Sequence, residues 1–267
     1  MSATIEVANP APARPSIVTR IPLSHRLPWW GEALIAFSFY WLYDFVQAAT
    51  QSDVDEARAH GVDLVHLERH LHVWAEPDIN RFLTQHDWLA MIGGYWYALA
   101  HVLVTSVVLG YLWWRHPRIE VALRNALVGM SIFALLVYWL YPVAPPRLTV
   151  NGLTDTLVSN DILGAAHVHK GLVNLYAAMP SLHVAWACWC AAGLTLALRS
   201  RWRYLAWLYP IAMTLVVVST ANHYFIDAVA GAALAAGPLV YVTVRTRRSA
   251  GSPENLTIVL PSPSPPS

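Results

Sequence analysis

The stretch WLAMIGGYWYALAHVLVTSVVLGYLWW (88–114) is continuously apolar and contains no Asp, Glu, Lys or Arg. A helix needs about 20 mainly apolar residues to cross the hydrocarbon core of a bilayer, so this stretch predicts a transmembrane helix. Five further apolar stretches have sufficient length, and they lie at 29–49, 121–144, 180–198, 202–221 and 223–244. The sequence therefore predicts an all-α fold, a polytopic membrane protein built as a bundle of six transmembrane helices.

The composition of the whole chain agrees with a membrane protein. Of its 267 residues 56% are hydrophobic and 12% are charged, with a mean hydropathy of +0.41. A soluble domain carries about 25% charged residues, so a soluble globule is excluded, as are a disordered chain and a disulfide scaffold. The net charge of +1 argues against nucleic acid as a partner.

The two ends of the chain differ from the apolar middle. Residues 1–28 contain five prolines and no apolar core, and residues 246–267 end in PSPSPPS. Such composition is typical of disordered segments. We expect two disordered cytoplasmic tails around a membrane domain at 29–245.

Basic residues indicate the orientation of the spans. If the segments alternate sides, one side holds both tails and the loops 115–120 and 199–203. Twelve of the 17 Lys and Arg residues lie on that side or just inside it, and the other five are Arg58, Arg69, Arg81, Arg147 and Lys170. Short basic loops stay in the cytoplasm. The sequence thus predicts a multi-pass protein of the cell membrane with cytoplasmic termini and the loops 50–87 and 145–179 outside.

The first outer loop contains a helical pattern of apolar residues. Leu64, Leu67, Leu71 and Trp74 recur at helical spacing, with polar residues, among them Glu68, between them. This pattern predicts an amphipathic interfacial helix. Packing against the bundle and covering a lipid site are both open as its role.

Three short polar motifs fall on the outer side of this topology. They are YPVAPPR (141–147), MPSLH (179–183) and ANHYFID (221–227). Their ionisable residues are Arg147, His183, His223 and Asp227. Ionisable residues at membrane depth are costly and usually functional, so these motifs predict one common site.

The residue types suit phosphoryl transfer. His223 and Asp227 lie four residues apart and share a helix face, where a carboxylate fixes the imidazole tautomer and leaves the other nitrogen as a nucleophile. His183 is placed to protonate a leaving group, and Arg147 carries a fork of donors suited to phosphate oxygens. We therefore predict a phosphohistidine intermediate.

Further residues are expected to contact the substrate. Ser181 precedes the fourth span, where backbone N–H groups favour an anion. His101 follows Tyr95 and Tyr97 in the second span and either lines a substrate cavity or makes a buried structural hydrogen bond. Asn222 and Tyr176 complete the expected contacts.

Other interpretations of the motifs remain open. Each motif alone is compatible with an ordinary helix end or loop, and two histidines with one carboxylate could bind zinc. Zinc is disfavoured because Arg147 would repel a cation. We accordingly expect neither a metal nor another cofactor.

Together the three motifs resemble the type 2 phosphatidic acid phosphatase superfamily. Over residues 88–245 the pattern looks most like the branch that contains fungal inositol phosphorylceramide synthase and its actinobacterial relatives. The resemblance implies a six-helix fold and metal-independent transfer from a lipid phosphate. It assigns His223 as nucleophile, Asp227 as its partner, His183 as acid and base, and Arg147 and Ser181 as phosphate contacts.

The sequence departs from the superfamily pattern at four positions. A lysine, a proline, a glycine and an arginine of that pattern are replaced here by Leu140, Leu148, Leu182 and Val217. Similar changes are found in the inositol phosphorylceramide synthase branch. They leave fewer cations for the phosphate than the phosphatases have.

Three functions stay open at this point. An alcohol, either a polyol or a lipid alcohol, attacks the intermediate in a phosphotransferase. Water attacks instead in a lipid phosphate phosphatase acting on phosphatidate or polyprenyl phosphate. The third function is that of a transporter or structural protein with a vestigial site. A phosphotransferase and a phosphatase would both bind a membrane lipid as substrate. Nothing in the sequence indicates the oligomeric state.

Overall fold

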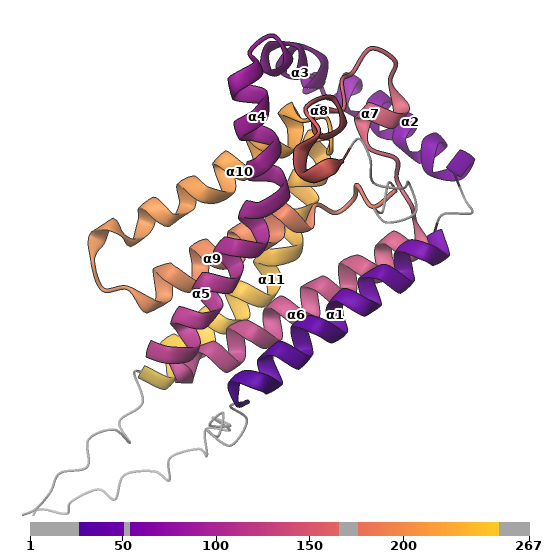
Figure 1. Cartoon of the computed structure of the whole chain (residues 1–267). Coiled ribbons are helices and arrows are strands. Elements are labelled where there is room, and N and C mark those ends of the chain that lie inside the picture. The colour runs from indigo at the N-terminus through magenta and orange to yellow at the C-terminus, as the bar shows by residue number, and fades with distance from the viewer. Residues whose placement is uncertain (1–26, 51–53, 166–175, 251–267) are drawn as a thin grey trace, which may run out of the picture.

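The computed structural model describes residues 27–50, 54–165 and 176–250, and within these ranges all regular structure is helical (Figure 1). The long helices are α1 (Trp29–Thr50), α2 (Val54–His70), α5 (His101–Arg115), α6 (Pro117–Leu140), α9 (Leu182–Ala197), α10 (Leu208–Ser219) and α11 (Phe225–Ala250). The shorter ones are α3 (Glu76–Thr84), α4 (Asp87–Tyr95), α7 (Pro146–Thr149) and α8 (Thr156–Ser159). A π-helical turn (Trp96–Ala100) joins α4 to α5, and 3₁₀ turns occupy Ile162–Gly164 and Arg201–Trp207. The predicted all-α class is confirmed for the described residues.

Within the described residues, four helical segments are long and apolar enough to cross a membrane. They are Asp87–Arg115, Pro117–Leu140, Arg201–Ser219 and Phe225–Val244. The other two predicted spans are also helical, but α1 is not among these four, and α9 is apolar with only 16 residues. The helices mark a membrane protein, and the count of six spans stays a prediction.

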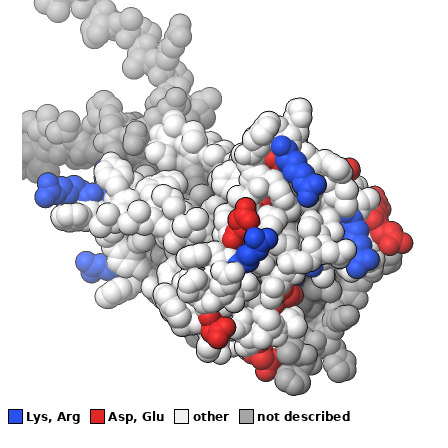
Figure 2. Space-filling view, turned by 90° about the horizontal axis from the view of Figure 1, so that it is seen from above, with Lys and Arg blue, Asp and Glu red and all other residues white. Residues whose placement is uncertain are grey.

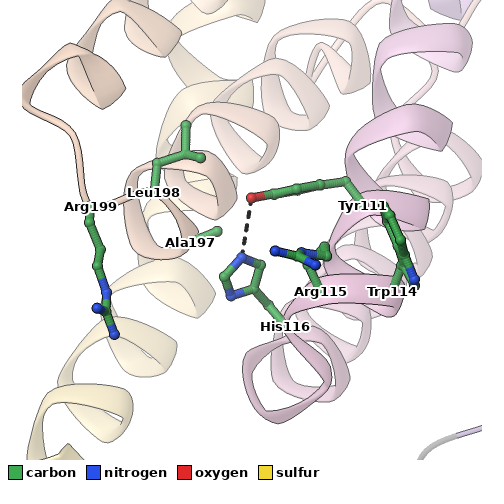
Figure 3. A pocket seen from close by; sticks show the side chains of 7 residues that line it. All are labelled: Tyr111, Trp114, Arg115, His116, Ala197, Leu198 and Arg199. Atoms are coloured by element: carbon green, nitrogen blue, oxygen red, sulfur yellow. Dashed lines mark hydrogen bonds between the residues drawn. The ribbon is translucent and has the colours of Figure 1, made fainter.

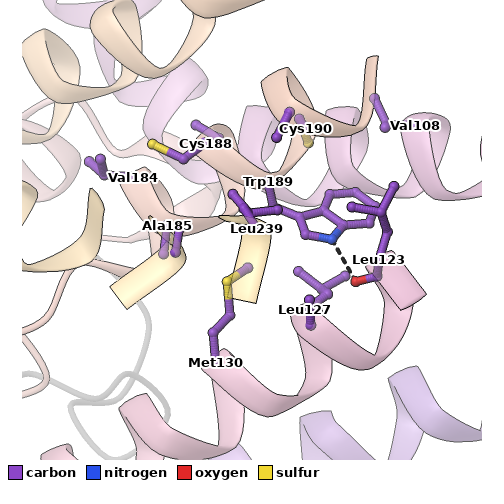
Figure 4. Packing of buried hydrophobic residues seen from close by; sticks show 14 of the residues in the cluster. Val108, Leu123, Leu127, Met130, Val184, Ala185, Cys188, Trp189, Cys190 and Leu239 are labelled. Carbon is purple, nitrogen blue, oxygen red and sulfur yellow. Dashed lines mark hydrogen bonds between the residues drawn. The ribbon is translucent and has the colours of Figure 1, made fainter. Parts of the chain in front are cut away.

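Helix α9 lies in the middle of the bundle, in contact with α5, α6, α10 and α11. Most of its side chains are buried, as expected of a helix that is apolar on all sides. Figure 4 shows Trp189 of α9 between Leu127, Met130 and Leu239, with its indole N–H donating to the carbonyl of Leu123 at 2.7 Å. Because neighbouring helices enclose α9, it fixes the position of the motif at its N-terminus.

An ion pair connects α1 to the bundle. Arg124 of α6 donates to the carboxylate of Glu32 in α1, and Glu120 lies 3.8 Å from the same guanidinium nitrogen. All three side chains are largely or fully buried. Arg124 thus has a structural partner at the end of the bundle where α1 begins.

The two ends of the bundle differ in content. Helix α1 begins and α11 ends at one end, while α2, α3, α7 and α8 gather at the other (Figure 1). Seen from that second end, acidic and basic side chains lie interspersed on the surface (Figure 2). Helix α11 continues to Ala250, into the first residues of the predicted tail at 246–267. Residues 251–267 and 1–26 lie outside the described residues.

The helix of the first outer loop is present, but a different face of it is buried. Helix α2 ends at His70, so Leu71 and Trp74 lie beyond it, and Leu67 is 44% exposed. Its buried residues are Ala57, Gly61, Leu64, Val65 and Glu68. Leu64 and Val65 pack with Val143, Ala178 and Tyr224. Helix α2 therefore packs against the motif segments through Leu64 and Val65, and its interfacial role stays a prediction.

A close contact between α11 and the second motif yields a first prediction. A Cβ atom at Gly231 would overlap the carbonyl oxygen of Ser181. We expect Gly231→Ala to lower the free energy of unfolding by about 1–3 kcal/mol, the usual cost of overpacking, and to reduce activity by displacing the His183 segment. Thermal melting of purified protein measures the first effect.

The matched control lies on the same helix. A Cβ at Gly237 meets nothing within 4 Å, so Gly237→Ala is expected to melt at or above the wild-type temperature. Equal melting temperatures for the two variants would contradict the contact.

Candidate active site

The three motifs meet through backbone hydrogen bonds at the end of the bundle that holds α7 and α8. The N–H of Ser181 donates to the carbonyl of Asp227 at 3.0 Å, and the N–H of Arg147 donates to the carbonyl of Ala221 at 3.2 Å. Segments far apart in the sequence are thereby locked to one another, and the loop before α11 lies between the other two motifs.

His223 is buried and its ring is held in one orientation. Its Nδ1 lies 2.7 Å from the carbonyl oxygen of Ala178 and 3.5 Å from Oδ2 of Asp227. A carbonyl oxygen only accepts, so Nδ1 carries the proton and the neutral ring has its lone pair on Nε2. The tautomer is therefore set by Ala178 first, with the Asp227 carboxylate adjacent to the same nitrogen.

Asp227 also organises the start of α11. It is fully buried, and its Oδ2 accepts from the N–H of Tyr224 at 2.9 Å, the residue that precedes the helix. A carboxylate at the third helical position that reaches back to this N–H is one half of a capping box. Asp227 thus joins the helix terminus to the imidazole of His223.

His183 faces His223 edge to face, with 5.5 Å between the ring centroids. Two side chains from the second predicted span enclose it: Tyr97 stacks on its ring at 4.4 Å, and the His101 ring lies 4.2 Å away. Both come from the π-helical turn or the residue that follows it, and such turns recur at functional sites. The structure therefore places His101 in the histidine cluster.

His101 makes the structural hydrogen bond that was one of the two roles considered for it. Its Nδ1 lies 3.2 Å from the carbonyl oxygen of Tyr97, which is the hydrogen bond of a buried structural histidine. The same ring contacts His183 and lies 5.9 Å from the ring of Trp186. Its contact with substrate stays a prediction.

Three other expected contact residues support the loops around the histidines. Ser181 caps α9 by accepting from the N–H of Val184, and the Asn222 amide donates to the carbonyl of Thr220 at 3.2 Å. The carbonyl of Tyr176 accepts from the N–H of Val143 at 2.9 Å. These hydrogen bonds hold the loops together, and binding of substrate by the three residues is not tested.

Arg147 has a carboxylate partner that the sequence did not reveal. Its Nε donates to Oδ2 of Asp155 at 2.9 Å, and its side chain is 8% exposed. Its backbone bonds to Ala221, which has φ +55°. This left-handed conformation costs a non-glycine residue about 1–2 kcal/mol. Arg147 therefore holds a strained turn two residues before His223, and a phosphate contact by its guanidinium stays a prediction.

A basic pocket lies away from this cluster, at the other end of the bundle. It has a volume of about 450 Å³ and is lined by Tyr111, Trp114, Arg115, His116, Ala197, Leu198 and Arg199 (Figure 3). Tyr111 and His116 form a hydrogen bond of 3.2 Å within it. None of the predicted site residues lines this pocket.

In the described part of the chain, no group of three or more His, Cys, Asp or Glu side chains is arranged to hold a metal ion.

Sequence reasoning missed several groups at the site. The role of the Ala178 carbonyl cannot be predicted from the sequence, because every residue has a backbone carbonyl group. Asp155 precedes a four-residue helix and accepts from its first N–H groups, so an Asp before Thr-Leu-Val-Ser was its only signal. Tyr97 was seen only as a neighbour of His101.

Comparison with known proteins agrees with this arrangement. A model of the PAP2 superfamily matches residues 62–241, a region that includes all three motifs and the π-helical turn. No curated protein and no solved structure matches the chain. Members of this superfamily are generally phosphatases or phosphotransferases, which indicates an enzyme that acts on a phosphate substrate. With the match covering most of the chain, the protein belongs to the PAP2 superfamily.

Proposed function

We propose that the protein is a membrane phosphotransferase or phosphoesterase that acts on a lipid phosphate or phospholipid headgroup through a phosphohistidine on His223. The observation that carries this proposal is the hydrogen bond from Nδ1 of His223 to the Ala178 carbonyl, with His183 at 5.5 Å between ring centroids. It leaves Nε2 as the nucleophilic nitrogen and supplies a second imidazole for proton transfer.

The proposed reaction has two steps. Nε2 of His223 attacks phosphorus, a P–N bond forms, the ester P–O bond breaks, and His183 gives its proton to the departing oxygen. An alcohol or water then attacks the same phosphorus, the P–N bond breaks, and His183 takes the proton of the attacking hydroxyl group. Asp227 offsets the positive charge that the His223 ring carries in between. Neither step uses a metal.

Arg147, Ser181, Asn222, Tyr176 and His101 are proposed to contact the substrate. Arg147 would use guanidinium nitrogens other than Nε, which Asp155 engages. Backbone N–H groups at the start of α9 would add donors for phosphate oxygens.

The attacking group distinguishes the proposed activities. We favour transfer to an alcohol, as in inositol phosphorylceramide synthase, because the departures from the phosphatase pattern match that branch. Hydrolysis of phosphatidate or polyprenyl phosphate is the second candidate, since it needs the same catalytic residues. A vestigial site is disfavoured because His183, His223 and Asp227 are all present and in contact.

A product analysis tests this proposal. The purified protein in nanodiscs is given phospholipids labelled in the phosphate, with and without inositol, glycerol or ceramide. Label in a new phosphodiester supports transfer, label in free phosphate supports hydrolysis, and intact substrate in every arm contradicts both. Activity is expected to survive EDTA; loss on chelation with recovery on adding zinc or magnesium would favour the metal alternative.

The orientation of the protein is a separate prediction. We expect the site to face outward and both termini to be cytoplasmic. Ser159 and Ser200 are both exposed, the first in α8 and the second between α9 and the following turn. On intact cells an impermeant thiol reagent should label Ser159→Cys and not Ser200→Cys. The native Cys188 and Cys190 are buried and give a low background. The reverse labelling would place the site in the cytoplasm.

A further inference from the structure

Three carboxylates hold the first turn of α11, and two of them come from distant parts of the chain. Asp227 accepts from the N–H of Tyr224, Glu76 of α3 accepts from the N–H of Phe225 at 2.9 Å, and Glu68 of α2 accepts from the N–H of Ile226 at 2.8 Å. All three carboxyl groups are fully buried. The N–H groups that a helix leaves unpaired at its start are therefore bonded by side chains directly after His223.

The two glutamates differ in their hydrogen bonds, and the difference indicates which of them carries a proton. Both oxygens of Glu76 accept from backbone N–H groups, Oε1 from Phe225 and Oε2 from Ala75 at 3.0 Å. In Glu68 only Oε1 has a donor, and the buried Oε2 has no hydrogen-bond partner among the described residues. A proton on Oε2 of Glu68 would turn this orphan acceptor into a donor, and the Glu76 carboxyl group belongs to the same buried cluster.

Charge supports the same assignment. The titratable groups that face Glu68 are Glu76 from α3 and Asp227 from α11, and Tyr224 lies in the same cluster. No Arg, Lys or His of the described chain forms an ion pair with either glutamate. Burial, followed by the neighbouring Glu76, raises the pKa of Glu68 from 4.5 to about 9. Two buried carboxylates without a cationic partner would be costly, and one shared proton reduces that cost.

We propose that Glu68 and Glu76 are positioning residues for the reaction: joined by one shared proton, they fasten the first turn of α11 and thereby fix His223 and Asp227 opposite His183. This inference rests on the proposed function. It also explains why α2 and α3 pack on the motif segments, because each contributes one carboxylate to the helix that carries Asp227.

The first test compares Glu68→Gln with the wild type by thermal melting across pH. A glutamine keeps an oxygen for the Ile226 N–H, and its amide group donates to Glu76 without needing a proton from solvent. A carboxyl group whose folded-state pKa lies above its unfolded value makes the folded protein lose stability as pH rises between those two values. The melting temperature of the wild type should therefore fall as pH rises from about 4.5 to about 9. The melting temperature of Glu68→Gln should fall less over the same range. Identical pH slopes would overturn the shared proton.

The second test is kinetic and uses the activity of the full chain. Glu68→Leu removes both hydrogen bonds and is expected to lower kcat by about 10²-fold with KM unchanged, because a small misplacement of reacting groups has this effect. Glu68→Gln should restore a kcat of the wild-type order. Glu56→Gln is the control on the same helix, where the side chain is 59% exposed.

The outcomes separate this inference from the proposed function. If Glu68→Gln is as slow as Glu68→Leu, the positioning role is overturned. Turnover by the wild type in the same assay would still support the proposed function. A wild type inactive on every phosphoester would overturn the function and the positioning role together. The melting comparison then still decides whether the two glutamates share a proton.

Discussion

Replacing His223 by alanine is expected to reduce turnover by about 10⁴-fold or more. Removal of a catalytic nucleophile reduces kcat by this order in other enzymes. The variant loses the nitrogen that would bond to phosphorus, and no other described side chain occupies its position between Ala178 and Asp227. Initial rates on a labelled phospholipid measure the effect, with melting curves to show that the variant folds. His86→Ala is the control, since that residue lies between α3 and α4 and its ring bonds to the carbonyl of Phe82 in α3, outside the proposed site. A variant with near wild-type rates would mean that the site is misplaced.

The variant Asp227→Asn tests the roles of Asp227 and Ala178 separately from that of His223. In a serine protease the corresponding change acts by selecting the wrong imidazole tautomer. Here the Ala178 carbonyl holds the Nδ1 proton at 2.7 Å, so the asparagine variant should keep the right tautomer. It loses only the charge that offsets the imidazolium, and we expect about 10²–10³-fold lower turnover, the usual effect of one electrostatic contact. A loss as large as that of His223→Ala would contradict the role given to Ala178.

The second large effect is expected for His183→Ala, and it depends on the substrate. Departure of a lipid alkoxide needs a proton, so turnover of a lipid phosphate should fall by about 10²–10⁴-fold. A p-nitrophenolate leaves without protonation, so the same variant should retain most of its rate of phosphoenzyme formation on p-nitrophenyl phosphate. The ratio of the two rates for each variant is the measurement. His223→Ala should lose both activities, and equal losses on both substrates for His183→Ala would contradict the division of roles.

The apolar pattern predicted the helical class and the helix positions because length and composition alone decide whether a stretch can span a bilayer. All six predicted spans fall on helices, yet among the residues that the structure describes four helical segments satisfy both length and hydropathy. Helix α9 shows why the distinction is difficult: it is apolar because it is enclosed by protein, and a buried core helix and a short span have the same composition.

The motifs predicted which residues would meet. Alternating spans place 141–147, 179–183 and 221–227 at one end, and the structure joins them through Ser181, Arg147 and His223. His223 and Asp227 are close, at 3.5 Å, as the motif predicted, but His223 precedes α11, so the two residues do not share a helix face. The catalytic roles of these residues remain predictions, since proximity alone does not measure them.

The partners of the motif residues could not be predicted. Glu68 is one of the polar residues of the predicted amphipathic helix, yet it is fully buried and its carboxylate bonds to α11, 158 residues away. Likewise the Asp before Thr156 indicates at most a helix start, and the pairing of Asp155 with Arg147 arises through tertiary structure alone. A periodic pattern reports which face is apolar, and it cannot report a buried polar contact between distant segments.

Trapping the covalent intermediate tests the central claim most directly. Purified protein is mixed with a substrate labelled in the phosphate, quenched within one turnover, digested and mapped. The account predicts label on His223 as a phosphoramidate, which is stable in alkali and lost in acid, and no label in His223→Ala. Turnover without label on His223, or label on a different residue, would contradict the phosphohistidine mechanism.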